Sequence, residues 1–327
     1  MKKLLTYMML LLILTACSSD DHEEEALLTE GDVTLVSFTR ATWSPELAQE
    51  EYSSIGVFLN SQPGQFHYRQ NDNRWHSNIE VTSGQSYRLY GYAPADAVTA
   101  AISEESEAGA TMTFTNLPSV SSQDICFVVG VQHMTEATGT KDIKLGQFAF
   151  TGGLQDHNFI NLQMDHLYAG LCFQMTIDSD YALLRSIKIK KMELQTSSST
   201  TTTTVKLVAN NSGTSPVSEV SYGTSTGEPM SATFFKSTDG EVLSADAVKE
   251  AMCCFVPTLG NDLTLVTTYD VYDRKGNKIA ERTASNKLPN LNVARGDLMT
   301  LLLTVNPTYL GVLSDPDLDN PPIIIEN

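Results

Sequence analysis

Six histidines are the side chains best suited to acid–base or metal chemistry, yet they are scattered along the chain. They are His22, His67, His76, His133, His157 and His166. No His-Glu-x-x-His or phosphate-binding glycine loop is present, although metal and phosphoryl chemistry use these spacings. His166 enters an apolar segment, where a hydrogen-bonded structural histidine is more frequent than a ligand. We therefore predict no catalytic residue and no enzyme activity.

Four cysteines lie in apolar segments: Cys126, Cys172, Cys253 and Cys254. None has C-x-x-C spacing or a zinc pattern with histidine, so we expect small buried hydrophobes, and their disulfide state stays open. Residues 315–326 place acidic groups at positions 1, 3, 5 and 12 of a calcium loop, but Asn320 replaces the required glycine. We expect no metal and no cofactor.

Cys17 is the candidate for covalent modification. It follows two lysines, an apolar stretch and the residues "LTA", a pattern that resembles a bacterial lipobox rather than a simple secretory cleavage site. The apolar stretch is too short to span a bilayer, which requires about 20 residues. The resemblance implies that residues 1–17 form a lipoprotein signal peptide and that Cys17 becomes the lipidated N-terminus, since several acyl chains anchor a protein firmly.

The next segment, residues 18–32, is polar and acidic, so it cannot bury enough surface to offset its ordering entropy and is predicted to be a flexible tether. The whole chain has 39 acidic and 21 basic residues, a net charge of −18 and a pI near 4.6. Because phosphate binding requires clustered Lys and Arg, we expect no nucleic-acid partner.

Short runs rich in Val, Ile, Thr, Tyr and Phe recur along the rest of the chain, separated by turn residues. The pattern predicts an all-β protein with two tandem antiparallel β-sandwich (transthyretin-like) domains. We place them at residues 41–180 and 181–309, with the boundary in a polar turn at 178–184. The threonine-rich run 195–204 is predicted to be a loop entering an edge strand, and residues 244–252 are the best candidate for a short helix, capped by Ser244.

Two segments near the ends of the chain attract attention. Residues 33–40 form an apolar and Thr/Ser strand candidate that runs into Arg40, the first basic residue after Lys3. Residues 310–327 follow the last core strand and end in Ile323, Ile324 and Ile325, an apolar segment that we predict to lack a partner in its own sheet. Because exposed β-forming ends are normally blunted, this tail is interpreted as a docking strand.

Several motifs resemble the fimbrillin family, the subunits of type V (protease-assembled) fimbriae of Gram-negative anaerobes. They are "LTAC" at 14–17, "VSFTRAT" at 36–42, "YRLYGYAP" at 87–94, "SQDICFVVG" at 122–130, "LQMDHLYAGLCFQM" at 162–175 and "RGDLMTLLLTV" at 295–305. The family usually has Asp-Leu-Leu-x-Ala at the segment that here begins with Asp124, and the tail of this chain is short. A stalk, a tip and an anchor subunit therefore all remain open.

The resemblance implies that an Arg-specific surface protease cuts between Arg40 and Ala41. The cut would release the strand that carries Val33, Leu35 and Phe38, and it would open a groove for a donor strand from another subunit. The expected locations are the outer membrane for the lipidated precursor and a cell-surface fimbrium for the mature subunit, which contributes to adhesion and biofilm formation, with a possible host or bacterial receptor.

Two alternatives to a polymerising subunit stay open from the sequence. One is a lipid-anchored fimbrial anchor that resists the cut at Arg40. The other is a monomeric surface lipoprotein that binds a glycan or host protein through exposed aromatic side chains, for which the candidates are Trp43, Trp75, Tyr68 and Tyr90. A sugar site of that kind requires aromatic rings on one exposed face, whereas the two tryptophans lie in separate segments.

Overall fold

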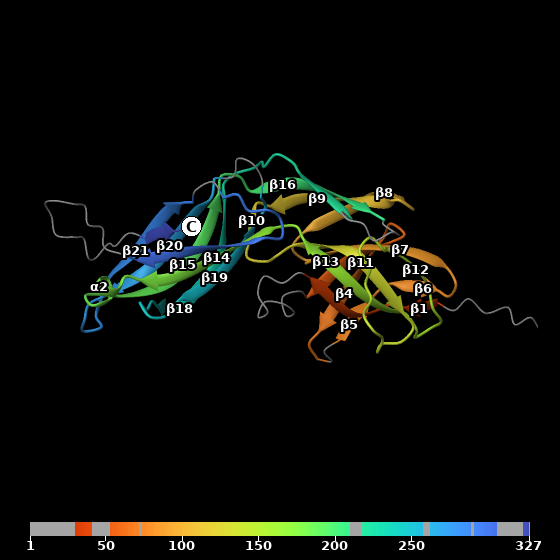
Figure 1. The fold of residues 1–327 in the computed structure, drawn as a ribbon, viewed down its shortest axis with the longest axis horizontal. Helices are drawn as coiled ribbons and strands as arrows, with labels where there is room; N and C mark the ends of the chain where they lie inside the picture. Colours follow the sequence, from red (N-terminus) through yellow and green to blue (C-terminus); the bar gives the residue numbers. More distant parts are fainter. Residues whose placement is uncertain are drawn as a thin grey trace, which may run out of the picture.

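A computed structural model describes residues 30–40, 53–71, 74–209, 217–257, 262–288, 291–305 and 323–326. Most of these residues lie in β-strands, and Figure 1 shows them in two lobes that follow one another along the long axis. Each lobe has its own buried hydrophobic cluster. The first cluster includes Leu35 and Phe127, and the part of the molecule around it is called the N-terminal lobe. The second cluster includes Leu171 and Leu301, and the part around it is called the C-terminal lobe. The all-β prediction is confirmed.

The N-terminal lobe is built on an eight-stranded sheet. Its order is β2 (Thr34–Arg40), β13 (Phe159–His166), β11 (Cys126–Met134), β7 (Ser86–Ala93), β3 (Ser54–Leu59), β4 (Gln62–Arg69) and β5 (Arg74–Ser77), with β12 (Ala149–Thr151) also paired to β7. All six residues of β3 are buried, as expected for an interior strand packed on both faces. A separate two-stranded ladder joins β1 (Glu30–Asp32) to β6 (Glu80–Thr82), so the last three residues of the predicted tether form a strand.

A second, four-stranded sheet contributes to the same core, in the order β17 (Ser218–Tyr222), β16 (Thr200–Val208), β9 (Gly109–Pro118) and β8 (Thr99–Ser106). The assignment of residues 200–222 to the C-terminal domain therefore differs from the structure, because β16 pairs with β9 and buries Val205 and Leu207 in the first cluster. The threonine run is also not an edge: β16 has a neighbour on both sides, and Thr201 and Thr203 are buried.

The C-terminal lobe also contains two sheets. The five-stranded sheet has the order β10 (Val120–Ser121), β19 (Lys249–Phe255), β14 (Ala169–Ile177), β22 (Leu298–Val305) and β23 (Ile323–Glu326). The four-stranded sheet has the order β18 (Met230–Val242), β15 (Ser186–Thr196), β20 (Thr264–Tyr272) and β21 (Lys278–Lys287). Pairing is antiparallel except for β13 with β2 and β14 with β22, which are parallel.

The chain passes from one core to the other earlier than predicted. Leu167 and Tyr168 belong to the first cluster, whereas Ala169 opens β14 and belongs to the second. The predicted boundary at 178–184 instead holds α2 (Ser179–Ala182), capped by the side chain of Asp178. Tyr181 of this helix is buried in the second cluster, so the polar residues there form a capped turn within a lobe.

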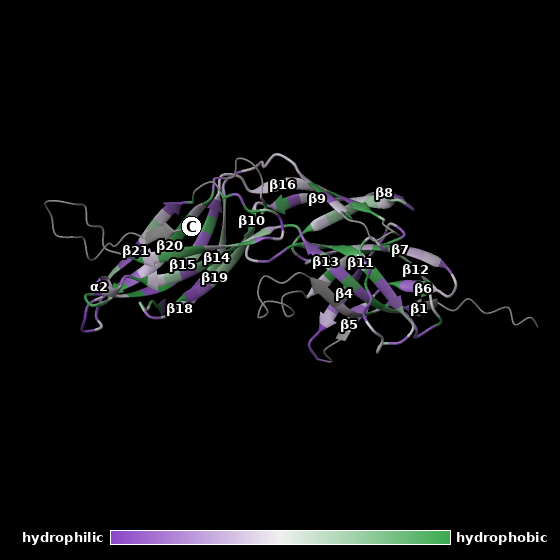
Figure 2. Ribbon diagram, viewed as in Figure 1, coloured by the Kyte–Doolittle hydropathy of each residue, from purple (hydrophilic) through white to green (hydrophobic). Residues whose placement is uncertain are grey.

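The helix predicted at 244–252 is wrong, because Lys249–Phe255 is strand β19, paired along its whole length with β14. Ser244 caps only a turn, accepting a hydrogen bond from the backbone of Asp246. Figure 2 shows hydrophobic and hydrophilic residues interleaved along the strands of both lobes, the period-two pattern of sheets with one buried face. None of the helices in the described parts of the chain is long and apolar enough to cross a membrane.

Candidate functional site

The predicted removable strand is an edge strand of the N-terminal lobe. Strand β2 pairs in parallel with β13, from Thr34 opposite Phe159 to Arg40 opposite Met164, and it stands at the end of the sheet order. The Ser37 hydroxyl donates to Asn161 Oδ1 at 2.6 Å. One flank of the strand is therefore held by a ladder, and within the described residues its other flank carries no ladder of that sheet.

The apolar side chains at the start of this segment are part of the core. Val33 is 1% exposed and Leu35 is 2% exposed, and both belong to the first hydrophobic cluster. Phe38 lies in β2 opposite Leu162, and Arg40 is the last residue of the strand. Cys17 and Ala41 lie outside the described residues. The predicted strand, 33–40, matches the observed Thr34–Arg40 to within one residue.

The strand beside β2 is β13, and its residues alternate between apolar and polar, as a groove that binds a strand requires. Ile160, Leu162 and Met164 of β13 are buried at 0 to 1% exposure, and Asn161 between them uses its amide for Gln132 Oε1. Because side chains of an extended strand alternate between faces, a strand laid in this place meets apolar neighbours at every second position. Its backbone meets the ladder groups of β13 that β2 now occupies.

The C-terminal tail was predicted to have no partner in its own sheet, and this prediction is wrong. Strand β23 pairs antiparallel with β22, from Val305 opposite Ile323 to Leu302 opposite Glu326. The interior partner of β22 is β14, with which it pairs in parallel. The end of the chain thus covers the edge that its own last core strand would otherwise present, the blunting that sheet edges generally need.

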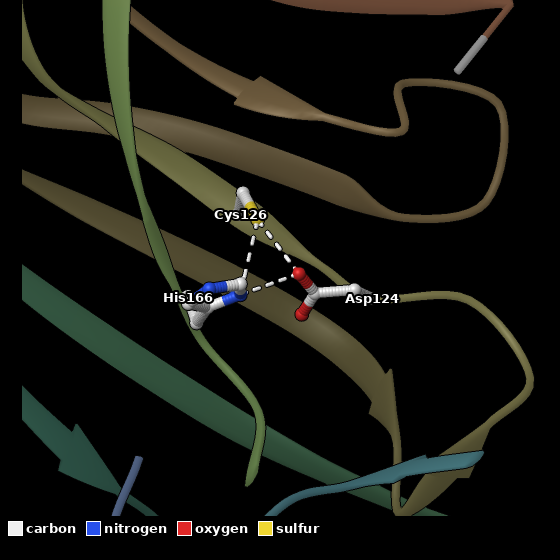
Figure 3. Close-up of side chains that lie close together, drawn as sticks. All are labelled: Asp124, Cys126 and His166. Carbon is white, nitrogen blue, oxygen red and sulfur yellow. Dashed lines mark hydrogen bonds and ion pairs between the residues drawn. The ribbon is translucent and has the colours of Figure 1, made fainter. Parts of the chain in front are cut away.

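A cluster of three side chains that could do chemistry lies at the end of β13. Figure 3 shows its members, Asp124, Cys126 and His166, close together. His166, the last residue of β13, places Nδ1 2.5 Å from Asp124 Oδ2, and the Cys126 thiol donates to the same oxygen at 3.1 Å. Cys126 Sγ is 3.8 Å from His166 Nδ1. Because a carboxylate only accepts hydrogen bonds, the imidazole proton belongs on Nδ1.

Residue types alone would allow this cluster to act as a nucleophile relay or a metal centre. The three residues are only 0 to 3% exposed, and each already hydrogen-bonds to another of the three. Two donors bound to one zinc lie about 3.3 to 3.6 Å apart, given bonds of about 2.0 to 2.3 Å in a tetrahedron, and the histidine–aspartate pair is closer than that. The arrangement is a hydrogen-bonded structural cluster, which agrees with the role predicted for His166.

The sequence alone does not join Asp124 and Cys126 to His166. The usable signal was their spacing of two, because residues i and i+2 of an extended segment share a face. The histidine is 42 positions from the aspartate, and only the pairing of β11 with β13, with Cys126 opposite His166, brings them together.

Arg295 links the segment before β22 to the end of β13. Its guanidinium donates to Asp165 Oδ2 and to the His166 carbonyl, both at 2.7 Å, and it lies 5.4 Å from the centre of the Phe127 ring. Gly296 follows with φ of +79°, a conformation that glycine adopts without strain. The Arg-Gly-Asp tripeptide is therefore a turn engaged with the other lobe.

The four aromatic candidates for ligand binding have different surroundings. Tyr68 and Trp75 face one another across β4 and β5 with ring centres 5.4 Å apart, and Tyr68 is 38% exposed. Tyr90 is fully buried, and Trp43 lies outside the described residues. The four cysteines in apolar segments are buried and free of disulfides, and burial raises the pKa of the Cys172 thiol, with the charge of Glu250 adding to the effect.

No family model matches this chain, and a search of curated proteins found no match. Solved structures do match. They include a candidate cell adhesion protein from Bacteroides fragilis (TM-score 0.47, 11% identity, 90% of this chain and 97% of that one) and a fimbrial protein from Bacteroides vulgatus (TM-score 0.42, 11% identity, 90% and 98%). A third is a candidate cell adhesion protein from Bacteroides ovatus (TM-score 0.41, 10% identity, 91% and 97%).

Proposed function

We propose that this chain is a structural or tip subunit of a cell-surface fimbrium, exported as a lipoprotein precursor and assembled by strand exchange after cleavage behind Arg40. The observation that carries the proposal is the position of β2: an apolar edge strand, paired on one flank to β13, ends at Arg40. The precursor would be anchored in the outer membrane through lipid on Cys17, and an Arg-specific surface protease would mature it.

Loss of β2 would change the N-terminal lobe in a specific way. The seven residues of the strand span about 23 Å at about 3.3 Å per residue. Their departure would leave the ladder groups of β13 unpaired and would expose the core around Val33 and Leu35. Unpaired edge groups above an apolar floor bind an added strand, whose backbone gives affinity and whose alternate side chains give register.

The donor that we propose is the C-terminal tail, residues 310–327, with Ile323, Ile324 and Ile325 as its apolar part. Support comes from β23, because this segment pairs as an edge strand with β22 of its own chain. Exchange then requires β23 to leave β22 and enter the β13 groove of another subunit. Because such contacts are head-to-tail and do not close, they generate a filament.

The test uses residues 18–327 treated with an Arg-specific protease, followed by N-terminal sequencing and unboiled gel electrophoresis. We expect a cut after Arg40 and a ladder of heat-sensitive oligomers. Arg40→Gln is the matched control that keeps the fold and removes the cut, and Arg69 and Arg282 report on selectivity. Cleavage at Arg40 without oligomers, or a ladder that still requires the cut when residues 321–327 are deleted, would overturn the proposal.

A monomeric surface binder is the second candidate, and the contact between exposed Tyr68 and half-buried Trp75 favours it. An anchor subunit is the variant of the fimbrial class that keeps its lipid. The same experiment separates these candidates, because an anchor resists the cut at Arg40 and a monomeric binder forms no ladder. Adhesion to a host or bacterial receptor is part of the proposal for a tip subunit.

A further inference from the structure

A cavity of about 560 Å³ lies in the N-terminal lobe, and Figure 1 shows two of the strands that line it, β7 and β12, toward the end of that lobe away from the C-terminal lobe. Its walls come from β7, from the turn between β8 and β9, and from residues 144–149. The volume falls within the range of about 300 to 1,000 Å³ that is usual for small-molecule sites. The cavity lies on different strands from the β2 edge.

The cavity contains a buried hydroxyl group that the fold leaves unused. Tyr90 lines it and is 0% exposed, and its hydroxyl has no hydrogen-bond partner among the described residues. The ring packs against Phe148 with centres 4.8 Å apart. Burial, followed by the charge of Glu105, raises the pKa of Tyr90 to about 12, so the group is a protonated donor and acceptor at neutral pH. A buried polar group without a partner is unfavourable unless something supplies one.

Two cations line the same cavity in a strongly acidic protein. Arg88 and Lys144 contribute to its wall, and the Arg88 guanidinium lies 4.0 Å from Glu107, whose side chain is 98% exposed. Exposed pairs of this kind hold their partners weakly, so Arg88 is available to another carboxylate. The planar guanidinium matches a carboxylate in two-pronged geometry, while Gln147 supplies a neutral amide.

A second hollow of about 390 Å³ adjoins the cavity, since Lys144, Gln147 and Ala149 line both. In the second hollow His133 stacks on Phe150, with centres 5.0 Å apart and planes at 17°. Together the two hollows form a groove lined by charged side chains of both signs, by neutral polar groups and by aromatic rings. That lining suits a ligand with several hydroxyl groups, one carboxylate and more than one ring.

We propose that this groove binds an acidic saccharide, with the sugar carboxylate on Arg88 and a sugar hydroxyl on the Tyr90 hydroxyl. The shared chemistry, a carboxylate on a hydroxyl-rich ring, occurs in sialylated glycans and in polysaccharides that contain uronic acid. The inference goes beyond the proposed assembly, because the groove is complete in the uncleaved monomer and requires neither the protease nor strand exchange.

The test uses residues 18–327 carrying Arg40→Gln, so that the protein stays uncleaved and a failure of assembly cannot affect the result. Sialyllactose, a hyaluronan tetrasaccharide and lactose are titrated by isothermal calorimetry. We expect saturable binding of at least one acidic sugar, with lactose at least tenfold weaker, since a hydrogen bond to a charged group is worth that ratio or more. Whichever acidic sugar binds identifies the source, and failure of both to exceed lactose overturns the proposal.

Variants then assign the site. Arg88→Gln should weaken the acidic sugar at least tenfold, and Tyr90→Phe should weaken it several-fold while leaving thermal stability equal or higher. Glu107→Gln should strengthen binding, because it removes a carboxylate that competes for Arg88. Arg282→Gln on the C-terminal lobe is the matched control and should have no effect. Binding that is unchanged by both Arg88→Gln and Glu107→Gln would contradict the assignment.

Discussion

The two lobes present the same construction at their edges and finish it differently. In each lobe, a strand from the β13–β14 segment pairs in parallel with a strand from one end of the chain: β13 with β2, and β14 with β22. β22 is covered on its outer flank by β23, whereas β2 is the end of its sheet in the described chain. One edge is therefore closed by the molecule itself, and the other is held by a strand that ends at Arg40, the proposed cut site.

The largest loss of stability is expected where β13 ends and β14 begins, because these two strands pair with β2 and β22. His166 ends β13 just before β14 begins, and Asp124 binds it from the segment before β11. Asp124→Ala leaves a buried imidazole without its carboxylate, so we expect a loss of about 3 to 5 kcal/mol in the free energy of unfolding. Urea denaturation measures it, with Asp142→Ala, an exposed aspartate, as the control. A loss below about 1 kcal/mol would show that the cluster is dispensable.

Core substitutions separate the two edges. Leu301 of β22 is 0% exposed and Leu35 of β2 is 2% exposed, so either change to alanine should cost the precursor about 2 to 5 kcal/mol. After cleavage and assembly, only Leu301→Ala should still lower stability, because Leu35 leaves with its strand. Thermal unfolding of precursor and polymer measures the contrast. A Leu35→Ala penalty that survives in the polymer would mean that β2 is retained.

Removal of β23 tests the closed edge by itself. Deleting residues 323–327 should cost about 1 to 3 kcal/mol, since a few ladder bonds are lost, each contributes about 1 kcal/mol, and fraying lowers the total. It should also increase self-association of the uncleaved protein, because the flank of β22 becomes exposed. Analytical ultracentrifugation at several concentrations measures this. An uncleaved protein that stays monomeric after the deletion would argue that β22 needs no cover.

The smallest effect concerns acid stability of the C-terminal lobe. The hydrogen bond from Lys191, at 2.7 Å, lowers the pKa of the Glu193 carboxyl, with smaller help from Ser231 and Thr233. Because the folded pKa lies below the unfolded value, this pair stabilises the protein above about pH 4.5 and the contribution is lost as the pH falls through the folded pKa. Its partial exposure limits the gain to about 1 kcal/mol or less. Glu193→Gln should flatten the stability–pH curve there, and an unchanged slope would contradict this assignment.

Local patterns were sufficient to predict the strands but not their partners. The bounds of β2 and the all-β class follow from alternation of apolar and polar residues. The return of β16 to the first core does not, because its partner β9 lies far away in sequence and a threonine-rich run suits either an exposed or a packed face. Residues 249–252 look helical in isolation, and pairing with β14 overrides that preference.

In the candidate site, too, local features could be predicted from the sequence and contacts between distant segments could not. Val33, Leu35 and Arg40 could be named from the sequence because one continuous segment contains them. The partner of the tail could not, since the pairing of Ile323–Glu326 with β22 depends on the path of the residues between them. The cluster at Asp124 likewise depends on a register between two strands, which no short window of sequence encodes.

The central claim is that β2 occupies a groove meant for another strand, and a peptide competition tests it most directly. A labelled peptide of residues 310–327 is added to protein cut after Arg40 and to the uncut Arg40→Gln protein, and binding is followed by fluorescence anisotropy and native mass spectrometry. We predict a one-to-one complex with the cut protein only, with release of the fragment that contains β2. Equal binding to both proteins, or a cut protein that keeps its β2 fragment and ignores the peptide, would contradict the claim.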